Sequence, residues 1–83
     1  MKRKILGLTM KVNKDTFGTN YEFQNPVSLT VLNCIIIALS EKFSYVRNFT
    51  DTVTIQGQEY YKGYIRCKDT EQLKKYWNIP MVL

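Results

Sequence analysis

Histidine is absent from this chain of 83 residues. Imidazole is the side chain that most often serves as a general base and as a metal ligand, so its absence removes the usual centre of many enzyme mechanisms. The two cysteines fall short of the four ligands of a structural zinc site, and the acidic residues are scattered. The glycines form neither of the known phosphate-binding patterns, GxGxxG and GxxxxGK[ST]. We therefore predict no catalysis, no metal and no cofactor.

Cysteine is scarce, and its two copies, Cys34 and Cys67, lie far apart in apolar segments. Without a CxxC spacing they do not resemble a disulfide framework, and buried free thiols are typical of a reducing compartment. Whether the two side chains approach each other is a question that the sequence leaves open.

Long apolar runs are also lacking. The run from Val31 to Leu39 is far short of the roughly 20 residues that a bilayer requires. The basic start, Lys2 to Lys4, is followed by a short apolar stretch as in a secretory signal, but Lys11 interrupts it and no small-residue cleavage site follows. The long helix expected below lacks the flanking lysines of a membrane-surface helix. We expect a cytoplasmic protein that does not bind membranes.

The chain does contain enough core-forming residues to fold as one domain, residues 1–83, because 45% of it is hydrophobic and 13% aromatic. The formal net charge is +5 and the isoelectric point is about 9.3. A basic balance of this kind favours an anionic partner, such as nucleic acid or an acidic protein surface. Whether the protein forms a homodimer is left open.

The pattern of apolar residues predicts an α+β fold, in which a mainly antiparallel sheet of three to five strands carries one long helix. Strands are expected over 4–12, 19–23, 45–55, as one bent or two short strands, and 60–68. Asn25 and Pro26 have the properties of an N-cap and a first helical residue, which places the helix at about 26–43. Its apolar stripe runs through Leu29, Leu32, Ile36, Leu39 and Phe43. A short helix is expected at about 70–77.

The strand at 60–68 has two unlike faces, because side chains alternate along a strand. One face would carry Tyr61, Ile65 and Cys67 toward a core. The other would carry Tyr60, Lys62, Tyr64, Arg66 and Lys68. Cations neutralise phosphates and aromatic rings stack on bases, so an exposed row of this composition suits single-stranded nucleic acid. The same residues also suit the wet face of an ordinary strand.

Lys62, Gly63 and Tyr64, followed by the expected helix from about residue 70, resemble the third strand and second helix of RNA-recognition-motif domains, a ferredoxin-like family. The resemblance covers about a quarter of the chain, residues 60–76. It implies that Tyr64 stacks on a base while Lys62 and Arg66 contact phosphates or bases. Ile65 and Arg66 stand where the family has a small residue and an aromatic one. The composition as a whole resembles that of small early bacteriophage proteins.

The sequence therefore supports two hypotheses. The first is a small basic, non-catalytic protein that binds RNA or another single strand, such as a phage accessory or anti-defence factor. The second is an inhibitor that binds a host or defence enzyme, for example a nuclease, alone or through RNA, since Tyr, Trp and Arg also anchor protein interfaces. The predicted nucleic-acid-binding residues are Tyr60, Lys62, Tyr64, Arg66, Lys68, Lys74, Lys75, Lys2, Arg3 and Lys4.

Overall fold

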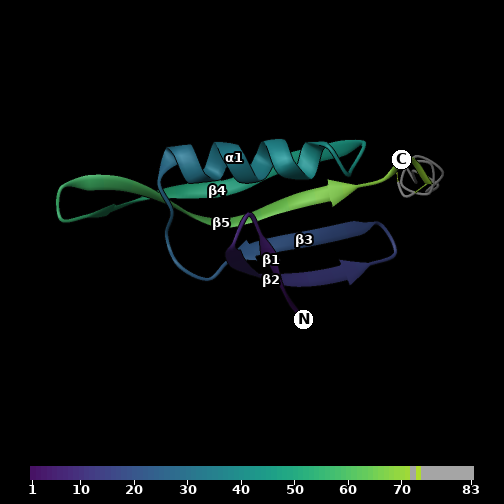
Figure 1. The fold of residues 1–83 in the computed structure, drawn as a ribbon, viewed down its shortest axis with the longest axis horizontal. Helices are drawn as coiled ribbons and strands as arrows, with labels where there is room; N and C mark the ends of the chain where they lie inside the picture. Colours follow the sequence, from purple (N-terminus) through teal and green to yellow (C-terminus); the bar gives the residue numbers. More distant parts are fainter. Residues whose placement is uncertain (72, 74–83) are drawn as a thin grey trace, which may run out of the picture.

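A five-stranded antiparallel sheet with one helix against it forms the fold (Figure 1). The structure is a computed structural model that describes residues 1–71 and 73. Its elements are β1 (Lys2–Ile5), β2 (Leu8–Asp15), β3 (Gly18–Phe23), α1 (Leu29–Ser40), β4 (Tyr45–Ile55) and β5 (Gln58–Lys68). The predicted α+β class is confirmed.

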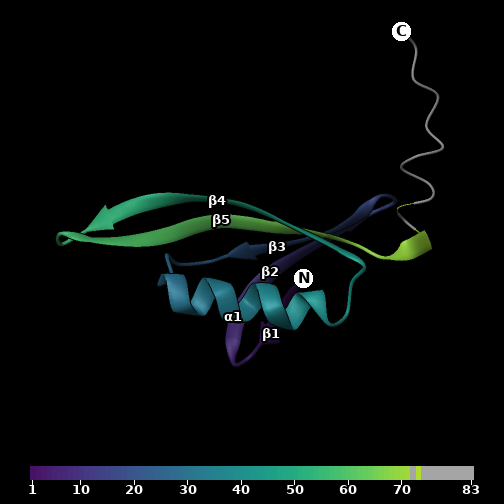
Figure 2. The same cartoon turned by 90° about the horizontal axis from the view of Figure 1, so that it is seen from above.

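The strands lie in the order β1-β2-β3-β5-β4, and every neighbouring pair is antiparallel. Strand β5 therefore lies inside the sheet, between β3 and β4, while β1 and β4 form the two edges. The helix follows β3 in the chain and covers one face of the sheet (Figure 2). Among the described residues, α1 covers one face of the sheet and no element covers the other.

The core lies between α1 and the covered face. Helix residues Leu32, Ile35 and Leu39 are almost fully buried there. The strands contribute Ile5, Met10, Val12, Tyr21, Phe23, Ile65 and Cys67. These strand positions alternate with exposed or half-buried residues, as expected for a sheet with only one face in the core.

The first predicted strand, 4–12, is wrong, because Leu6 and Gly7 divide it into β1 and β2. Both residues have positive φ, 51° and 81°, which is typical of the two-residue type I′ turn that fits the twist of a hairpin. The same turn joins β4 to β5, where φ is 50° at Gln56 and 78° at Gly57. An apolar residue in such a turn need not be buried, and Leu6 is 70% exposed.

The predicted helix at 26–43 is confirmed in its centre but is too long at both ends. Its N-cap is Ser28, whose Oγ accepts a hydrogen bond from the backbone N–H of Val31 at 3.3 Å. Asn25 cannot be the cap, because Val27 is held in an antiparallel bridge to Tyr61 by backbone hydrogen bonds of 2.7 and 2.8 Å. The helix can begin only after this bridge.

The predicted short helix at 70–77 lies mostly outside the described residues. Thr70, Glu71 and Leu73 are helical, and the Leu73 N–H donates to the carbonyl of Asp69 at 3.0 Å. Lys74 and Lys75 are not among the described residues. Within the described part of the chain, no helix combines the length and apolar character that crossing a membrane requires.

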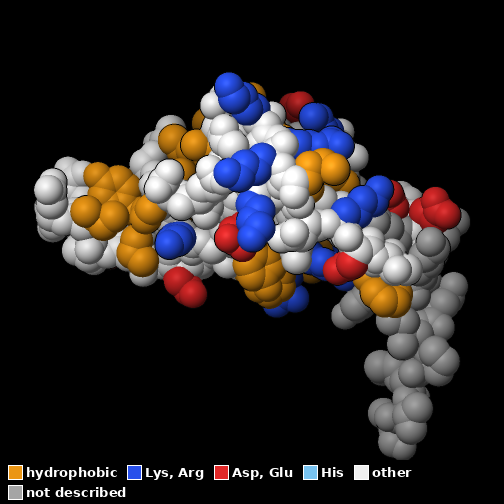
Figure 3. All heavy atoms as spheres, turned by 90° about the horizontal axis from the view of Figure 1, so that it is seen from below, with side chains coloured by type: hydrophobic (Ala, Val, Ile, Leu, Met, Phe, Trp, Pro, Cys, Tyr) orange, Lys and Arg blue, Asp and Glu red, His pale blue; other side chains and the backbone are white. Residues whose placement is uncertain are grey.

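The hairpin of β4 and β5 extends well beyond the other three strands (Figures 1 and 2). Strand β3 pairs with β5 only from Tyr64 to Cys67, whereas β4 pairs with it along the whole length of both strands. Hydrophobic side chains gather toward the end of this hairpin (Figure 3), where Ile55 is 43% exposed. The molecule is accordingly elongated, with a longest dimension of 47 Å.

The backbones of β5 and β4 approach closely at Gly63. A Cβ atom there would lie 2.5 Å from the carbonyl oxygen of Phe49 and 2.9 Å from the Cα of Thr50, and φ is 141°. We predict that Gly63→Ala lowers the free energy of unfolding by roughly 1–3 kcal/mol, measured by urea denaturation. Gly57→Ala is the control, because it shares a positive φ but meets open space. An equal loss in both variants would contradict the close approach.

The two cysteines differ in exposure, and neither is in a disulfide. Burial raises the pKa of the Cys67 thiol to about 11. Cys34 lies on the exposed side of α1, so the expectation that both cysteines are buried is wrong for Cys34.

We predict that iodoacetamide modifies only Cys34 in the native protein and modifies both cysteines after unfolding, because the thiolate is the reactive form. Peptide mass spectrometry measures this, and native modification of Cys67 would refute it.

Candidate nucleic-acid interface

The uncovered face of the sheet, here called the open face, lies opposite α1 (Figure 2). Strand β5 determines which residues lie on the open face. Ile65 and Cys67 of this strand are fully buried on the face that α1 covers. The alternate residues of β5 must then point to the open face. They are Tyr60, Lys62, Tyr64, Arg66 and Lys68. The predicted division of this strand into two faces is confirmed.

Strand register extends the open face across all five strands. Direct cross-strand partners share a face, and one continuous row contains a residue from each strand: Lys2, Lys11, Glu22, Tyr64 and Phe49. The adjacent row contains Asn13, Asn20, Arg66 and Arg47. Aromatic and basic residues from β4 and β5 thus meet polar and basic residues from the N-terminal strands.

Two neighbouring aromatic rings lie on the open face at the β4 edge of the sheet. The rings of Phe49 and Tyr64 are stacked, with centroids 5.1 Å apart and an angle of 13° between their planes. The guanidinium carbon of Arg47 lies 5.0 Å from the centroid of the Phe49 ring, a cation–π arrangement. Phe49 and Tyr64 remain 40% and 37% exposed, so this stack is accessible to a ligand.

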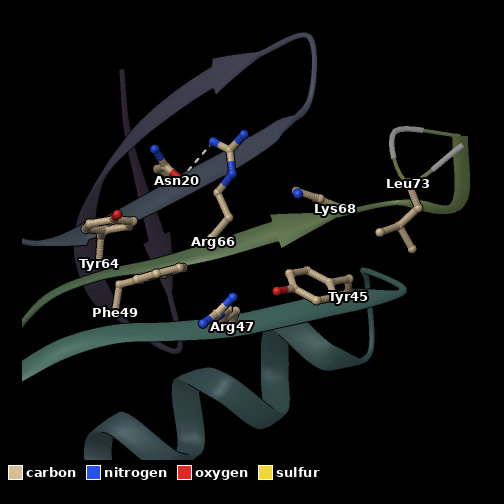
Figure 4. A pocket seen from close by; sticks show the side chains of 8 residues that line it. All are labelled: Asn20, Tyr45, Arg47, Phe49, Tyr64, Arg66, Lys68 and Leu73. Carbon is tan, nitrogen blue, oxygen red and sulfur yellow. Dashed lines mark hydrogen bonds between the residues drawn. The ribbon is translucent and has the colours of Figure 1, made fainter. Parts of the chain in front are cut away.

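A shallow depression of about 330 Å³ lies beside the stack (Figure 4). Strands β3, β4 and β5 provide most of its wall, and one residue comes from the segment after β5. The lining residues are Asn20, Tyr45, Arg47, Phe49, Tyr64, Arg66, Lys68 and Leu73. Its mixed aromatic and cationic wall suits a flat, polar, anionic ligand.

Arg66 is held in place by other residues of the chain. Its guanidinium donates to both carboxylate oxygens of Asp15, at 3.0 and 3.1 Å, and to the side-chain oxygen of Asn20 at 3.0 Å. The Arg66 side chain is only 18% exposed. Asp15 therefore neutralises much of the Arg66 charge, so Arg66 holds neighbouring side chains in place more than it attracts phosphate.

Lys68 is also less accessible than the sequence suggests, because it is 8% exposed. Its ammonium nitrogen lies 5.4 Å from the centroid of the Tyr45 ring. Burial next to an aromatic ring strengthens a cation–π contact but leaves little of the charge facing solvent. Lys68 thus lines the depression rather than projecting from it.

Other cations on the open face are exposed: Lys2, Lys4, Lys11, Arg47 and Lys62. Figure 3 views the β1–β2 side of the molecule and shows Lys and Arg side chains spread over it, with acidic side chains between them. Arg3 pairs with the buried Met10, which places it on the covered face. It lines a different depression, together with Lys14 and Tyr21.

The structure therefore brings seven of the ten predicted residues onto one face, leaves Arg3 on the other, and does not describe Lys74 and Lys75. Sequence reasoning missed Tyr45, Arg47 and Phe49 of β4. Their signal was present as the same alternation of aromatic and basic residues that marked β5, but Asn48 and Asp51 obscured it. It also missed Lys11 and Asn20, which only strand register places here.

The described residues contain no cluster of three or more Cys, Asp or Glu side chains suited to a metal ion. No protein-family model, no curated protein and no solved structure matches this chain. The function must therefore be argued from the open face itself.

The Asp15–Arg66 contact gives a pH-dependent stability. The hydrogen bonds that Arg66 donates to Asp15 lower the pKa of the Asp15 carboxyl below its ordinary value of 3.8. A lowered folded-state pKa stabilises the protein above the unfolded pKa, and this stabilisation is lost as the pH falls through the folded-state pKa. We predict that Asp15→Asn lowers the free energy of unfolding at pH 7 by less than about 1 kcal/mol, because the pair is at the surface.

Urea denaturation of both proteins between pH 7 and pH 2 measures this effect. The difference in free energy of unfolding between the two proteins should disappear as the pH falls below about 4, because Asp15 of the native sequence then becomes protonated. Asparagine is a matched replacement, because its side-chain oxygen can still accept the N–H of Phe17, which donates to Asp15 at 2.8 Å. A difference that does not change with pH would show that charge is not involved.

Proposed function

We propose that this protein is a non-catalytic binder of single-stranded nucleic acid, with RNA favoured, and that it binds through the open face. The observation that carries the proposal is the exposed Phe49–Tyr64 stack on the open face, with the exposed cations Arg47 and Lys62 on either side of it along the strands. Stacking platforms combined with a basic surface are the usual means of binding single strands. A closed duplex would reward the rings little, because its bases are already stacked.

Tyr64 is the residue on which a base would stack. One side of the Phe49 ring is covered by Tyr64, and Arg47 also lies against this ring. The side of the Tyr64 ring that faces away from Phe49 looks toward β3 (Figure 4). A base placed there would extend an existing stack, so little side-chain ordering would be needed on binding.

Phosphates would be contacted along the row that crosses the strands. Lys11 lies two strands from Tyr64, about 10 Å away, and Lys2 lies one strand further. Glu22 stands between Lys11 and Tyr64 and opposes a phosphate at that point. Contacts of this kind read the backbone and the flat face of a base, and they predict binding with little sequence preference.

A protein target is the second candidate, and one observation favours it. Cations near the rings already interact within the chain, because Arg47 lies against the Phe49 ring and Arg66 is paired with Asp15, so the surface around the rings is more aromatic than cationic. Preordered aromatic residues beside an arginine are typical of hot spots in protein interfaces. An inhibitor of a host or defence enzyme would use the same face.

Parallel titrations of labelled single-stranded RNA, single-stranded DNA and duplex test the first proposal. We expect single strands to bind more tightly than duplex, with affinity falling as salt is raised. Tyr64→Ala should cost on the order of 1–3 kcal/mol of binding free energy, the range for one stacked base, and Tyr64→Phe should retain binding. Absence of binding to all three would contradict the proposal and favour the protein target.

Charge variants provide matched controls. Lys11→Gln should weaken binding, whereas Lys42→Gln, which removes an exposed lysine just after α1, should not. Glu22→Gln should strengthen binding, because it removes the one acid from the row that contains Tyr64. A gain of affinity cannot be explained by misfolding, so this variant separates a direct effect from a loss of structure.

A further inference from the structure

The two edges of the sheet are protected to very different degrees. Strand β1 is four residues long and contains Lys2, Arg3 and Lys4, and both shortness and lysine discourage pairing with another strand. Strand β4 is 11 residues long, contains no lysine or proline, and is rich in Thr, Val and aromatic residues. Nothing in the described part of the chain pairs with its outer side. It is an edge suited to strand addition.

One hydrogen bond shows which backbone groups of β4 face outward. The N–H of Thr50 donates to the side-chain oxygen of Asn48 at 2.9 Å, so it points away from β5. Outward groups recur at every second residue of an antiparallel strand. The type I′ turn gives the same result, because its closing residues, Ile55 and Gln58, bond to each other. The outward groups therefore belong to Val46, Asn48, Thr50, Thr52 and Thr54.

We propose that the β4 edge pairs with the β4 edge of a second copy of this chain, antiparallel and centred on Phe49. Charge complementarity favours this pairing. On the open face, Arg47 precedes Phe49 by two residues and Asp51 follows it by two. A two-fold axis at Phe49 places Arg47 of each copy opposite Asp51 of the other. Both ion pairs fall at the narrow, non-hydrogen-bonded positions, where side chains are closest.

Neighbouring registers lack this match. Centring on Thr50 places Arg47 opposite Val53 and Asp51 opposite Phe49, which leaves both charges without a partner across the interface. Centring on Asp51 places two aspartates directly opposite each other, which destabilises a strand pair. Only the register centred on Phe49 pairs both charges, and it also brings the two Phe49 rings together at the axis.

The rest of the fold is compatible with this pairing. A two-fold axis perpendicular to the sheet leaves both α1 helices on the same face of a ten-stranded sheet. Helix α1 contains no charged residue, and its Leu29, Val31 and Ile37 are exposed. The two open faces would become continuous, with the Phe49–Tyr64 stacks adjacent. Pairing requires no nucleic acid, so this inference stands apart from the proposed function.

Asn48 must change its hydrogen bond when the edges meet. In the single chain its side chain satisfies the outward N–H of Thr50. In the paired register, Thr50 lies opposite Asn48 of the other copy, and the N–H would donate to the backbone carbonyl there instead. One hydrogen bond replaces another, so the Asn48 side chain satisfies this one N–H in the single chain without preventing the pairing.

Sedimentation equilibrium over a range of protein concentrations tests the pairing. The native sequence should approach the mass of two chains as concentration rises. Arg47→Asp and Asp51→Arg should each weaken self-association about tenfold or more, because each places like charges at both pairs. An equimolar mixture of the two variants should associate again, since every pair then joins opposite charges.

Lys14→Asp is the matched control, because it makes the same change in charge as Arg47→Asp at an exposed position on β2. It should associate like the native sequence, and circular dichroism of all variants should be unchanged. A single-chain mass at every concentration would overturn the proposal and leave the edge to an extended segment of another protein. Self-association that neither β4 variant weakens would overturn it in favour of a different surface.

Discussion

Burial of one face of β5 is the constraint on which the rest of this structure depends. Ile65 and Cys67 are fully buried between the sheet and the helix residues Leu32, Ile35 and Leu39. Because side chains alternate along a strand, a shift of one residue would move Tyr64 and Arg66 into the core. The apolar side of β5 thus determines the composition of the open face, although the residues that form that face contribute little to the core themselves.

Much of the fold followed from local pattern. The alternation in β5 predicted that strand and its buried side, because the signal depends only on residues close in sequence. The apolar spacing of α1 predicted the helix and only part of its buried side, since Leu29 of the expected stripe is 51% exposed. The predicted helix boundary was wrong because residues far apart in the sequence pair with each other. The helix begins at Leu29 and not at Pro26 because Val27 pairs with Tyr61, and no local signal reports a contact over that distance.

The candidate site shows the same division. Tyr64 and Lys62 lie on the face predicted for them, but the state of Arg66 was beyond sequence reasoning, because the residue that neutralises it, Asp15, is 51 positions away. The stacking of Tyr64 on Phe49 likewise depends on the register of β4 against β5. The alternation along a strand therefore predicts on which face a basic residue lies, but it does not predict whether the charge of that residue is available to a ligand.

The order of the strands also divides the chain into two locally built halves. β1, β2 and β3 form a meander of neighbours in sequence, and β4 and β5 form a hairpin closed by a two-residue turn. The halves join along β3 and β5, whose paired residues are more than forty positions apart. Loop-closure entropy is therefore concentrated in this short junction of four residue pairs and the Val27–Tyr61 bridge beside it, with the chain through α1 serving as the loop that they close.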